Sequence, residues 1–457
     1  MQIRDLGMKI LLIDSRKLAF TFLLGSLMWA EPVLSLTLKE TLIESLKNSN
    51  DLASSRESWV AARESVFSST SSEEISLKYT GSGSLSESDS GSGFKSSDSY
   101  SNKITLSKNI YDGGQSRESL SLARINLQRA TASYNDTEQK VLLKAVQSYL
   151  DLIKSRQEAE LQIKNLERLS RHVTAAKVKL REGTDTPTSL AEAQARYARA
   201  QADSIIANTS VENAEDLFFK LTLVRPNSHM KSDILLDLNQ ILPASQGLAE
   251  SLAIKDNPKV KIAKLAEKAA AQELHVTQAK QNPTVAFSLS ATQGNASDSL
   301  SASISLSSPL YFTDSSAANA RKKVALHSQS IIDLRESVSA AKVEARSAFR
   351  DYTGVKITLS AVIAEVEASR LVSEGRLSET KYGLKTTLDL LDAEKNFYDA
   401  ELRLVKAEHD KTLSEFELLA AVGNLTAIKL GLGNILEDLT QSPRPKNPLN
   451  SPVSIWK

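Results

Sequence analysis

The 457-residue chain is large, polar and poor in aromatic residues: 41% are hydrophobic, 24% charged and 5% aromatic. This composition excludes a polytopic helical membrane protein, and the absence of cysteine excludes disulfides, thiol nucleophiles and cysteine-ligated zinc. The formal net charge of +1 provides no basic field for nucleic acid, so we expect no nucleic-acid partner.

Residues 1–30 predict an export signal at the N-terminus. Basic residues precede an apolar run from Leu18 to Trp29, which is of signal-peptide length and too short to span a membrane as a helix. Cleavage could follow Ala30 or come as late as Ser35. The alternative to a cleaved signal is a retained anchor. An exported bacterial protein is therefore the expectation.

Four short stretches show the alternation of apolar and polar residues that is typical of β-strands exposed to two different environments. They lie near residues 75–83, 99–108, 284–291 and 299–308. Apolar residues on one face and Ser, Thr or Lys on the other indicate transmembrane barrel strands with a water-filled interior. The alternative is a pair of soluble hairpins that cap a helical bundle.

Four strands cannot close a barrel, because the smallest bacterial barrels have about eight and open edges are not tolerated in hydrocarbon. A barrel built from these strands would therefore be shared between chains. Two copies would give eight strands and three would give twelve, and the arithmetic does not choose between them.

Long helices are predicted on either side of these strands. The segment between Gly114 and Gly183 contains no Gly and no Pro, which allows one helix of roughly 100 Å. From Leu190 to Leu221, small and apolar residues then recur three and four apart, as in a coiled-coil seam. We expect this seam to serve packing.

The chain repeats itself at an offset of about 200 residues. The sequence LSKNIY at 106–111 is matched by LSSPLY at 306–311, and Gly183 and Leu190 are matched without a gap by Gly383 and Leu390. Such a long period indicates duplication of a half-protein. We expect the following segments: a first repeat at 37–222 with a helical hairpin at 115–222, an equatorial segment at 223–250, a second repeat at 251–423 with a hairpin at 315–423, and a second equatorial segment at 424–457 that ends in a disordered Pro-rich tail.

Each hairpin ends in a tip at which a glycine is followed by polar helix-capping residues, at residues 183–190 and 383–390. Elsewhere we find no pattern that predicts catalysis, a metal site or a cofactor. The five His residues are scattered without a metal-binding spacing, and the Gly-rich run from Gly81 to Phe94 lacks the Gly-Lys-Ser/Thr of a phosphate loop. We expect that run to be an extracellular loop.

Several of these segments together resemble one known family. They are LSKNIYDGG at 106–114, GTDTPTSLAEAQARYARAQ at 183–201 and KYGLKTTLDLLDAEKNFYDAELRLVKAE at 381–408. In order, spacing and duplication, they are similar to the TolC-like outer membrane efflux proteins. The resemblance covers the chain from about Thr37 to Gly423.

The resemblance implies an α+β membrane protein in the bacterial outer membrane. Three chains would each contribute four strands to one β-barrel that contacts outer-membrane lipid, continued by a long periplasmic α-helical coiled-coil tunnel. Such a homotrimer would be a passive exit duct of a tripartite efflux or type I secretion system. Its partners would be a periplasmic adaptor protein and an inner-membrane transporter, and it would need no cofactor. The alternative class is a periplasmic coiled-coil adaptor or scaffold that forms no pore.

In this family the hairpin tips form a periplasmic entrance that acidic residues constrict. The matching residues here are Asp389 and Asp392, which lie three apart on one helix face. Three copies would make two carboxylate rings, which would favour cations and raise the pKa of the crowded carboxyls. The alternative is an acidic first helical turn that the helix dipole favours. Gly183, Thr184, Tyr382, Gly383 and Leu384 would contact the adaptor.

The family's latch between the two hairpins is only partly matched. Lys385 stands at the position of the basic latch residue. Its acidic partner on the first hairpin falls at Ser189, and the usual tyrosine falls at Thr380. Tyr382 and Asp185 are candidates to take over these roles.

Overall fold

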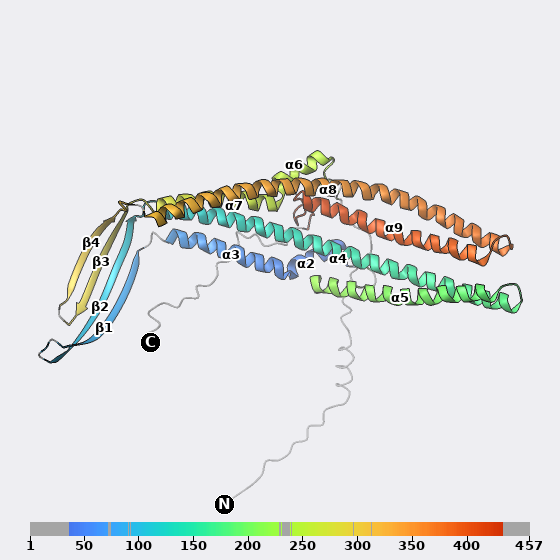
Figure 1. Cartoon of the computed structure of the whole chain (residues 1–457), viewed down its shortest axis with the longest axis horizontal. Helices are drawn as coiled ribbons and strands as arrows, with labels where there is room; N and C mark the ends of the chain where they lie inside the picture. The colour runs from blue at the N-terminus through green and yellow to red at the C-terminus, as the bar shows by residue number, and fades with distance from the viewer. Residues whose placement is uncertain are drawn as a thin grey trace, which may run out of the picture.

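The computed structural model describes residues 36–71, 75–89, 91, 93–227, 230, 238, 240–295, 297–311 and 313–432. These residues form a long rod, with a β-sheet at one end and two helical hairpin tips at the other (Figure 1). The predicted export signal and the Pro-rich tail lie outside the described residues, as does much of the segment 223–250.

Each half of the chain folds into the same series of two short helices, a strand pair and a long helical hairpin. The first half contains α2 (Leu38–Asn48), α3 (Asn50–Ser71), β1 (Ser76–Asp89), β2 (Phe94–Tyr111), α4 (Gln115–Arg181) and α5 (Pro187–Thr222). The second half contains α6 (Gln246–Asp256), α7 (Pro258–Ala279), β3 (Thr284–Gly294), β4 (Ser299–Ser307), α8 (Asp314–Lys381) and α9 (Thr387–Ala421).

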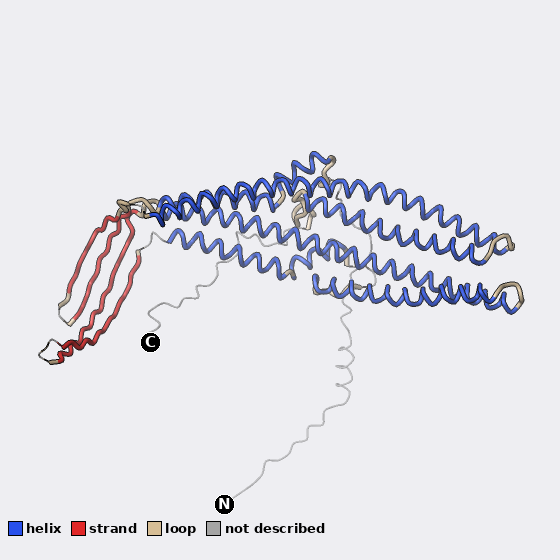
Figure 2. The backbone as a smooth tube through the Cα atoms, in the orientation of Figure 1, coloured by secondary structure: helices blue, strands red, loops and turns tan. Residues whose placement is uncertain are grey.

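The strands form one antiparallel, four-stranded sheet in the order β1-β2-β3-β4. The strands of the two halves are joined in its centre, where β2 pairs with β3 from Ser101↔Gly294 to Tyr111↔Val285, with a register shift between Asn109 and Tyr111. Strands β1 and β4 are the edges of this sheet, and among the described residues neither has a second strand partner (Figure 2).

Strand β1 is longer than its alternation predicts. The prediction that Gly81 to Phe94 forms a loop is wrong for residues 81–89, which pair in register with β2 up to Asp89↔Phe94. Ser occupies every second position there, and cross-strand pairs such as Ser84 and Ser99, whose hydroxyls lie 2.7 Å apart, extend the ladder. The Gly residues between them suggested a turn because they are depleted in ordinary strands.

The long helices run side by side along the rod. Helix α4 has 67 residues and α8 has 68, which correspond to about 100 Å each. Near the sheet, α4 packs between α3 and α7, and α7 packs on α8. Towards the tips, α4 packs on α5 and α9, and α9 packs on α8. No described helix is apolar over a stretch long enough to cross a bilayer.

The predicted seam is confirmed by burial. Its small residues are buried where α5 and α9 face their neighbours: Ala193, Ala200, Ser204 and Ala214 in α5, and Ala393, Ala400, Ala407 and Ser414 in α9. Small side chains let helix backbones approach closely, which a tightly wound wall of helices requires.

The main hydrophobic core lies halfway along the rod, where α5 and α9 end against α4. Its largest fully buried side chains are Tyr149, Phe218 and Phe416. The chain after α9 docks here, since Glu138 of α4 accepts a hydrogen bond from the amide of Ala427 at 2.8 Å. Burial raises the pKa of Glu138. This core fixes the two hairpins and the sheet to one scaffold.

Candidate functional site at the helical tips

The first tip joins α4 to α5 and is held by its own backbone. Gly183 has a φ of 70°, a conformation that glycine adopts without steric cost. The amide of Thr184 donates to the carbonyl of Lys179 at 2.9 Å, which caps α4. The amide of Ser189 then donates to the hydroxyl of Thr186 at 3.2 Å, which caps the start of α5. Gly183 and Thr184 are both exposed.

The second tip joins α8 to α9 in the same way. Gly383 has a φ of 73°, and the amide of Leu384 donates to the carbonyl of Glu379 at 2.9 Å. The side chains at its end are apolar and exposed, with 82% of Tyr382 and 73% of Leu384 open to solvent. A partner protein could bury both.

Asp389 caps α9. The amide of Asp389 donates to the Thr386 hydroxyl at 3.1 Å, while the Asp389 carboxylate accepts from the Thr386 amide at 3.0 Å and from its hydroxyl at 2.8 Å. This reciprocal arrangement is a capping box. The hydrogen bonds from Thr386, with a smaller contribution from the charge of Lys385, lower the pKa of Asp389. Within the protomer, this effect opposes the rise in pKa that we expect from crowded carboxylate rings.

Asp392 links the two hairpins. Arg196 of α5 donates from Nη2 to Asp392 Oδ1 at 2.7 Å and to Glu192 Oε1 at 2.8 Å. The guanidinium is three-quarters buried, whereas the Asp392 side chain is 57% exposed. Asp392 therefore both faces solvent and holds α9 against α5.

Glu394, two residues further along α9, makes a second link to the first hairpin. Its carboxylate lies 2.7 Å from Nε2 of His172 in α4, and its carbonyl accepts a hydrogen bond from Arg168 at 3.4 Å. Both side chains of the His172–Glu394 pair are largely buried. The Tyr398 hydroxyl also donates to the Gln162 side chain of α4.

Tyr382 and Asp185, the candidates to replace the family's latch residues, do not connect the two hairpins within the protomer. Asp185 accepts from the amide of Thr186 and the hydroxyl of Ser189, so it caps its own tip. Tyr382 points to solvent, and the Thr380 hydroxyl donates to the carbonyl of Thr386 in the same tip. Lys385 forms no ion pair with any residue that the structure describes. The cross-links instead lie on α9 beyond the tip.

Sequence reasoning missed Arg196, Glu394 and His172. A signal for Arg196 was present. At the repeat offset of 200 residues, Glu192 and Asp392 occupy equivalent positions, and Arg196 lies four residues after Glu192. Nothing in the sequence pairs His172 with Glu394, because that contact depends on how the hairpins cross.

A third link, made by a histidine, joins the hairpins nearer the core. His409 of α9 lies 3.0 Å from Asp151 of α4 through Nε2 and 2.9 Å from Asp410 through Nδ1. Its side chain is 9% exposed. The hydrogen bond to Asp151 raises the pKa of His409, and that of Asp151 is correspondingly lowered. The pair therefore favours an ionised carboxylate beside a protonated ring.

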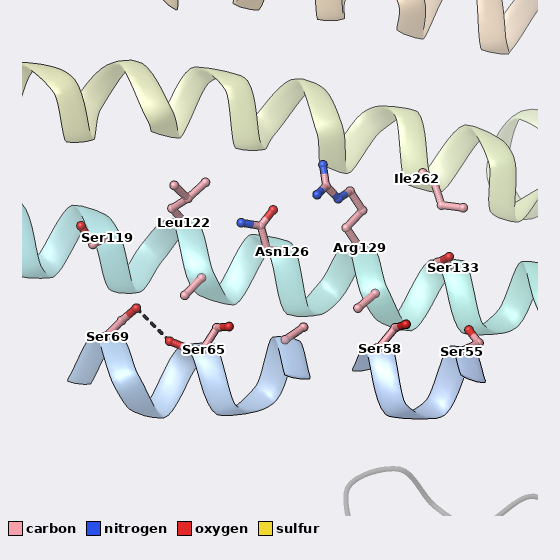
Figure 3. Close-up of a pocket in the computed structure, with 13 residues that line it drawn as sticks. Ser55, Ser58, Ser65, Ser69, Ser119, Leu122, Asn126, Arg129, Ser133 and Ile262 are labelled. Atoms are coloured by element: carbon pink, nitrogen blue, oxygen red, sulfur yellow. Dashed lines mark hydrogen bonds between the residues drawn. The ribbon is translucent and has the colours of Figure 1, made fainter. Parts of the chain in front are cut away.

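A further hollow lies nearer the sheet. This groove of about 670 Å³ runs over α4 between α3 and α7, and it is lined by Ser58, Ser65 and Ser69 of α3, by Ser119, Asn126 and Arg129 of α4 and by Ile262 of α7 (Figure 3). Ser69 donates to the carbonyl of Ser65 at 2.9 Å, so this hydroxyl serves its own helix. Within the described residues, no three His, Asp or Glu side chains come together as metal ligands would.

Comparison with known proteins agrees with this geometry. The chain matches the family described as outer membrane efflux protein over residues 42–221 and 250–424. It is 26% identical to the outer membrane efflux protein BepC of Brucella suis, with 91% of both chains covered. It is 22% identical to the outer membrane protein TolC of Vibrio cholerae, covering 88% of this chain and 93% of that one. The crystal structure of the Campylobacter jejuni CmeC outer membrane channel superimposes with a TM-score of 0.74 at 16% identity, covering 85% and 86% of the two chains.

Proposed function

Because this chain belongs to the outer membrane efflux protein family, we propose that three copies form a passive exit duct of a tripartite efflux or type I secretion system. Its place is the bacterial outer membrane, with the helical rod in the periplasm. A periplasmic adaptor would contact the tips at Gly183, Thr184, Tyr382, Gly383 and Leu384, and an inner-membrane transporter would supply the energy.

The observation that carries this proposal is the sheet with two open edges. Its apolar face includes Leu77, Ile104 and Leu306, which are exposed in the single chain and suit contact with lipid. Unpaired edges cannot stay open in hydrocarbon, so β1 and β4 must pair with other copies. Three copies of a four-stranded sheet give twelve strands, enough to close a barrel around a water-filled lumen.

The helices support the same assembly. Helices α4 and α8 continue directly from β2 and β4, so a closed barrel imposes a closed ring of helices beneath it. The comparisons favour this arrangement over a periplasmic scaffold that never enters the membrane.

Conductance in a planar bilayer tests the duct. Purified protein should give discrete, stable current steps, and the native protein should stay with the membrane after carbonate or urea extraction. A protein that washes off the membrane and gives no current would be a scaffold instead.

As a second part of this proposal, the contacts of Asp392 with Arg196 and of Glu394 with His172 hold the entrance closed. Outward movement of the α8–α9 hairpin has to break the ion pair of Asp392 with Arg196 and the contact between Glu394 and His172. Both contacts lie in the first turns of α9, next to the apolar tip that an adaptor would contact. Asp389 and Asp392 would line the entrance with carboxylates, and Lys385 would lie beside them.

Arg196→Ser tests the closing role, with Arg199→Ser as its control. Arg199 lies on the same helix, its side chain is 84% exposed, and it lies 3.9 Å from Asp203 of its own helix. We expect a larger mean conductance for Arg196→Ser and the wild-type conductance for Arg199→Ser. Equal conductance of wild type and Arg196→Ser would contradict the closing role.

Asp389→Ala with Asp392→Ala tests the carboxylate entrance. The reversal potential in a salt gradient should move towards zero as cation preference is lost. An unchanged reversal potential would show that neither carboxylate selects ions.

A further inference from the structure

The polar face of the sheet is almost uniformly hydroxylic. Residues that pair directly across an antiparallel ladder share a face, so the register groups the side chains. One row across all four strands is Ser76, Ser107, Ser288 and Ser303. The hydroxyls of Ser76 and Ser107 lie 2.6 Å apart, and those of Ser288 and Ser303 lie 2.8 Å apart.

By register this face carries three lysines: Lys95, which pairs with Ser88 near the β1–β2 turn, and Lys78 and Lys103, which interrupt the hydroxyl wall in the next two rows. Lys78 pairs with Thr105 in a row that continues to Ser290. Lys103 pairs with Thr80 in the row above, which continues to Thr292. Both lysines are exposed, and neither forms an ion pair or hydrogen bond with any described residue.

Lys78 and Lys103 are diagonal neighbours on adjacent strands. Residues in this relation lie about 7 to 8 Å apart, within reach of one bound anion between two flexible ammonium groups. Like charges so placed repel each other when nothing neutralises them. The carboxylates of the described strands do not neutralise the two lysines, because Glu87 and Asp98 fall on the apolar face with Leu85.

The apolar face of a barrel contacts lipid, so the face with the two lysines lines the lumen. We propose that Lys78 and Lys103, repeated in three copies, form an anion-binding ring in the lumen of the barrel. The proposal rests on the proposed trimeric duct. Its ligand class is multivalent inorganic or organic anions that enter from the barrel side. The ring is separated from the acidic entrance by the length of the helical tunnel.

Two opposite charge rings at the two ends of one duct would act on different ions. The carboxylates at the tips would favour cations at the periplasmic entrance, and the lysines would hold anions near the exit. Reversal potential reports both rings together. Block by a multivalent anion from one side isolates the lysine ring, because the ion meets the barrel before it meets the tunnel.

The experiment measures block of single-channel current by inorganic tripolyphosphate added to the barrel side. We expect concentration-dependent block at the polarity that drives anions into the barrel, and weaker block after addition to the tip side. In the double variant Lys78→Ser with Lys103→Ser, the blocking concentration should rise about tenfold or more. Serine suits both positions, because it already occupies most of this face.

Lys108→Ser is the matched control. Lys108 lies on β2, only a short distance from Lys103, but it pairs with Phe287 and therefore lies on the apolar face. Removing its charge should leave the block unchanged. Equal block of wild type and the double variant, or loss of block in Lys108→Ser alone, would overturn the ring. A wild-type protein that never conducts would instead overturn the duct, and the two failures are thus distinct.

Discussion

The two halves of the chain contain the same elements, and their helices have almost the same lengths, whereas β2 has 18 residues and β4 only 9. Helices α2 and α6 have 11 residues each, α3 and α7 have 22 each, α5 and α9 have 36 and 35, and α4 and α8 have 67 and 68. The halves differ in what surrounds these elements. Helix α4 is packed by α3, α7, α5 and α9, whereas α8 is packed by α6, α7 and α9.

This difference is visible in burial. Helix α4 buries large side chains such as Leu142, Val146 and Tyr149, whereas α8 buries only Ala341, Ala345 and Val362. Duplication therefore sets the order of the elements and the lengths of the helices, and the place of a helix in the wall sets its surface. A helix at the edge of the wall has one flank without a neighbour.

That flank of α8 carries a stripe of exposed apolar residues. Ile332, Val343, Ile357 and Val372 are all exposed, and at 100° per residue they fall on one side of the helix, where Arg350 interrupts them. Contact with a partner would bury these apolar side chains. In the proposed trimer, the neighbouring copy covers the stripe.

The largest effect should come from a charge placed in this stripe. Val343→Asp would bury a carboxylate in the contact between copies, and we expect loss of the trimer. Size-exclusion chromatography with light scattering in detergent measures the mass. Leu248→Asp on α6, at a residue that is 45% exposed, is the control and should leave a trimer. A Val343→Asp trimer of normal stability would place the copy-to-copy contact elsewhere.

The next largest effect should be a difference in stability between substitutions at the residues that follow α9 and α5. Gly423 follows α9 with a φ of 76°, and a Cβ there would lie 2.5 Å from the backbone of Asp256. Leu223 is the equivalent residue after α5, with a φ of 56°, and it is 59% exposed. The same left-handed turn is thus crowded in one half and open in the other.

Gly423→Ala should lower the free energy of unfolding by about 2 to 4 kcal/mol, because backbone must move. Leu223→Gly should raise it by about 0.5 kcal/mol, since glycine relieves the left-handed strain but gains unfolded-state entropy. Thermal unfolding followed by circular dichroism measures both. Equal effects at the two positions would contradict the difference in crowding.

A smaller effect should depend on pH. Because the pKa of His409 is raised by Asp151, its stabilisation is complete below the ordinary histidine pKa of about 6.5 and is lost as pH rises through the raised value. Because the pKa of Asp151 is lowered, its contribution is present above about 3.9 and is lost as pH falls through the lowered value. Stability of the α4–α9 contact should therefore be highest between these limits.

His409→Gln should flatten the alkaline side of this profile. Lys154 and Asp410 also face the histidine and remain in the variant. Asp351, the equivalent of Asp151 in the second half, accepts a hydrogen bond from Ser347 and forms no ion pair with the residues that the structure describes. Asp351→Asn should leave the profile unchanged, and melting temperature against pH provides the comparison.

The smallest effect should be local to the tips. Asp389 and Ser189 are equivalent residues, and Asp389→Ser would give the second tip the cap of the first. We expect faster hydrogen exchange in the first turn of α9 and unchanged exchange in α5. Acid should cause the same change in the wild type, because the lowered pKa of Asp389 makes its cap persist until pH falls through that value.

Much of this architecture could be predicted from the sequence because it depends on local periodicity. Alternation in the strands, the seam of α5 and α9, and the glycine at each tip all act within one element. Strand length was underestimated at 81–89, since Gly and Ser there form a ladder that depends on the partner strand. The contacts of His172 and His409 were not predictable, because they join residues more than 200 positions apart.

The candidate site was predicted in part for the same reason. The tips were located by their capping residues, which are local. The importance of Arg196 came only from the structure, because the angle between hairpins decides which charge reaches Asp392. The resemblance supplied the acidic positions but assigned to Asp389 a role that its capping box also explains.

The serine ladders have a consequence for anything that passes along them. In the pairs of Ser84 with Ser99 and of Ser290 with Ser301, one hydroxyl donates to the other across the strands. The remaining donor and acceptor sites of these exposed hydroxyls face water, so a passing molecule only exchanges hydrogen bonds with water for hydrogen bonds with serine and gains little. Away from the lysines, the wall therefore binds cargo of varied chemistry weakly.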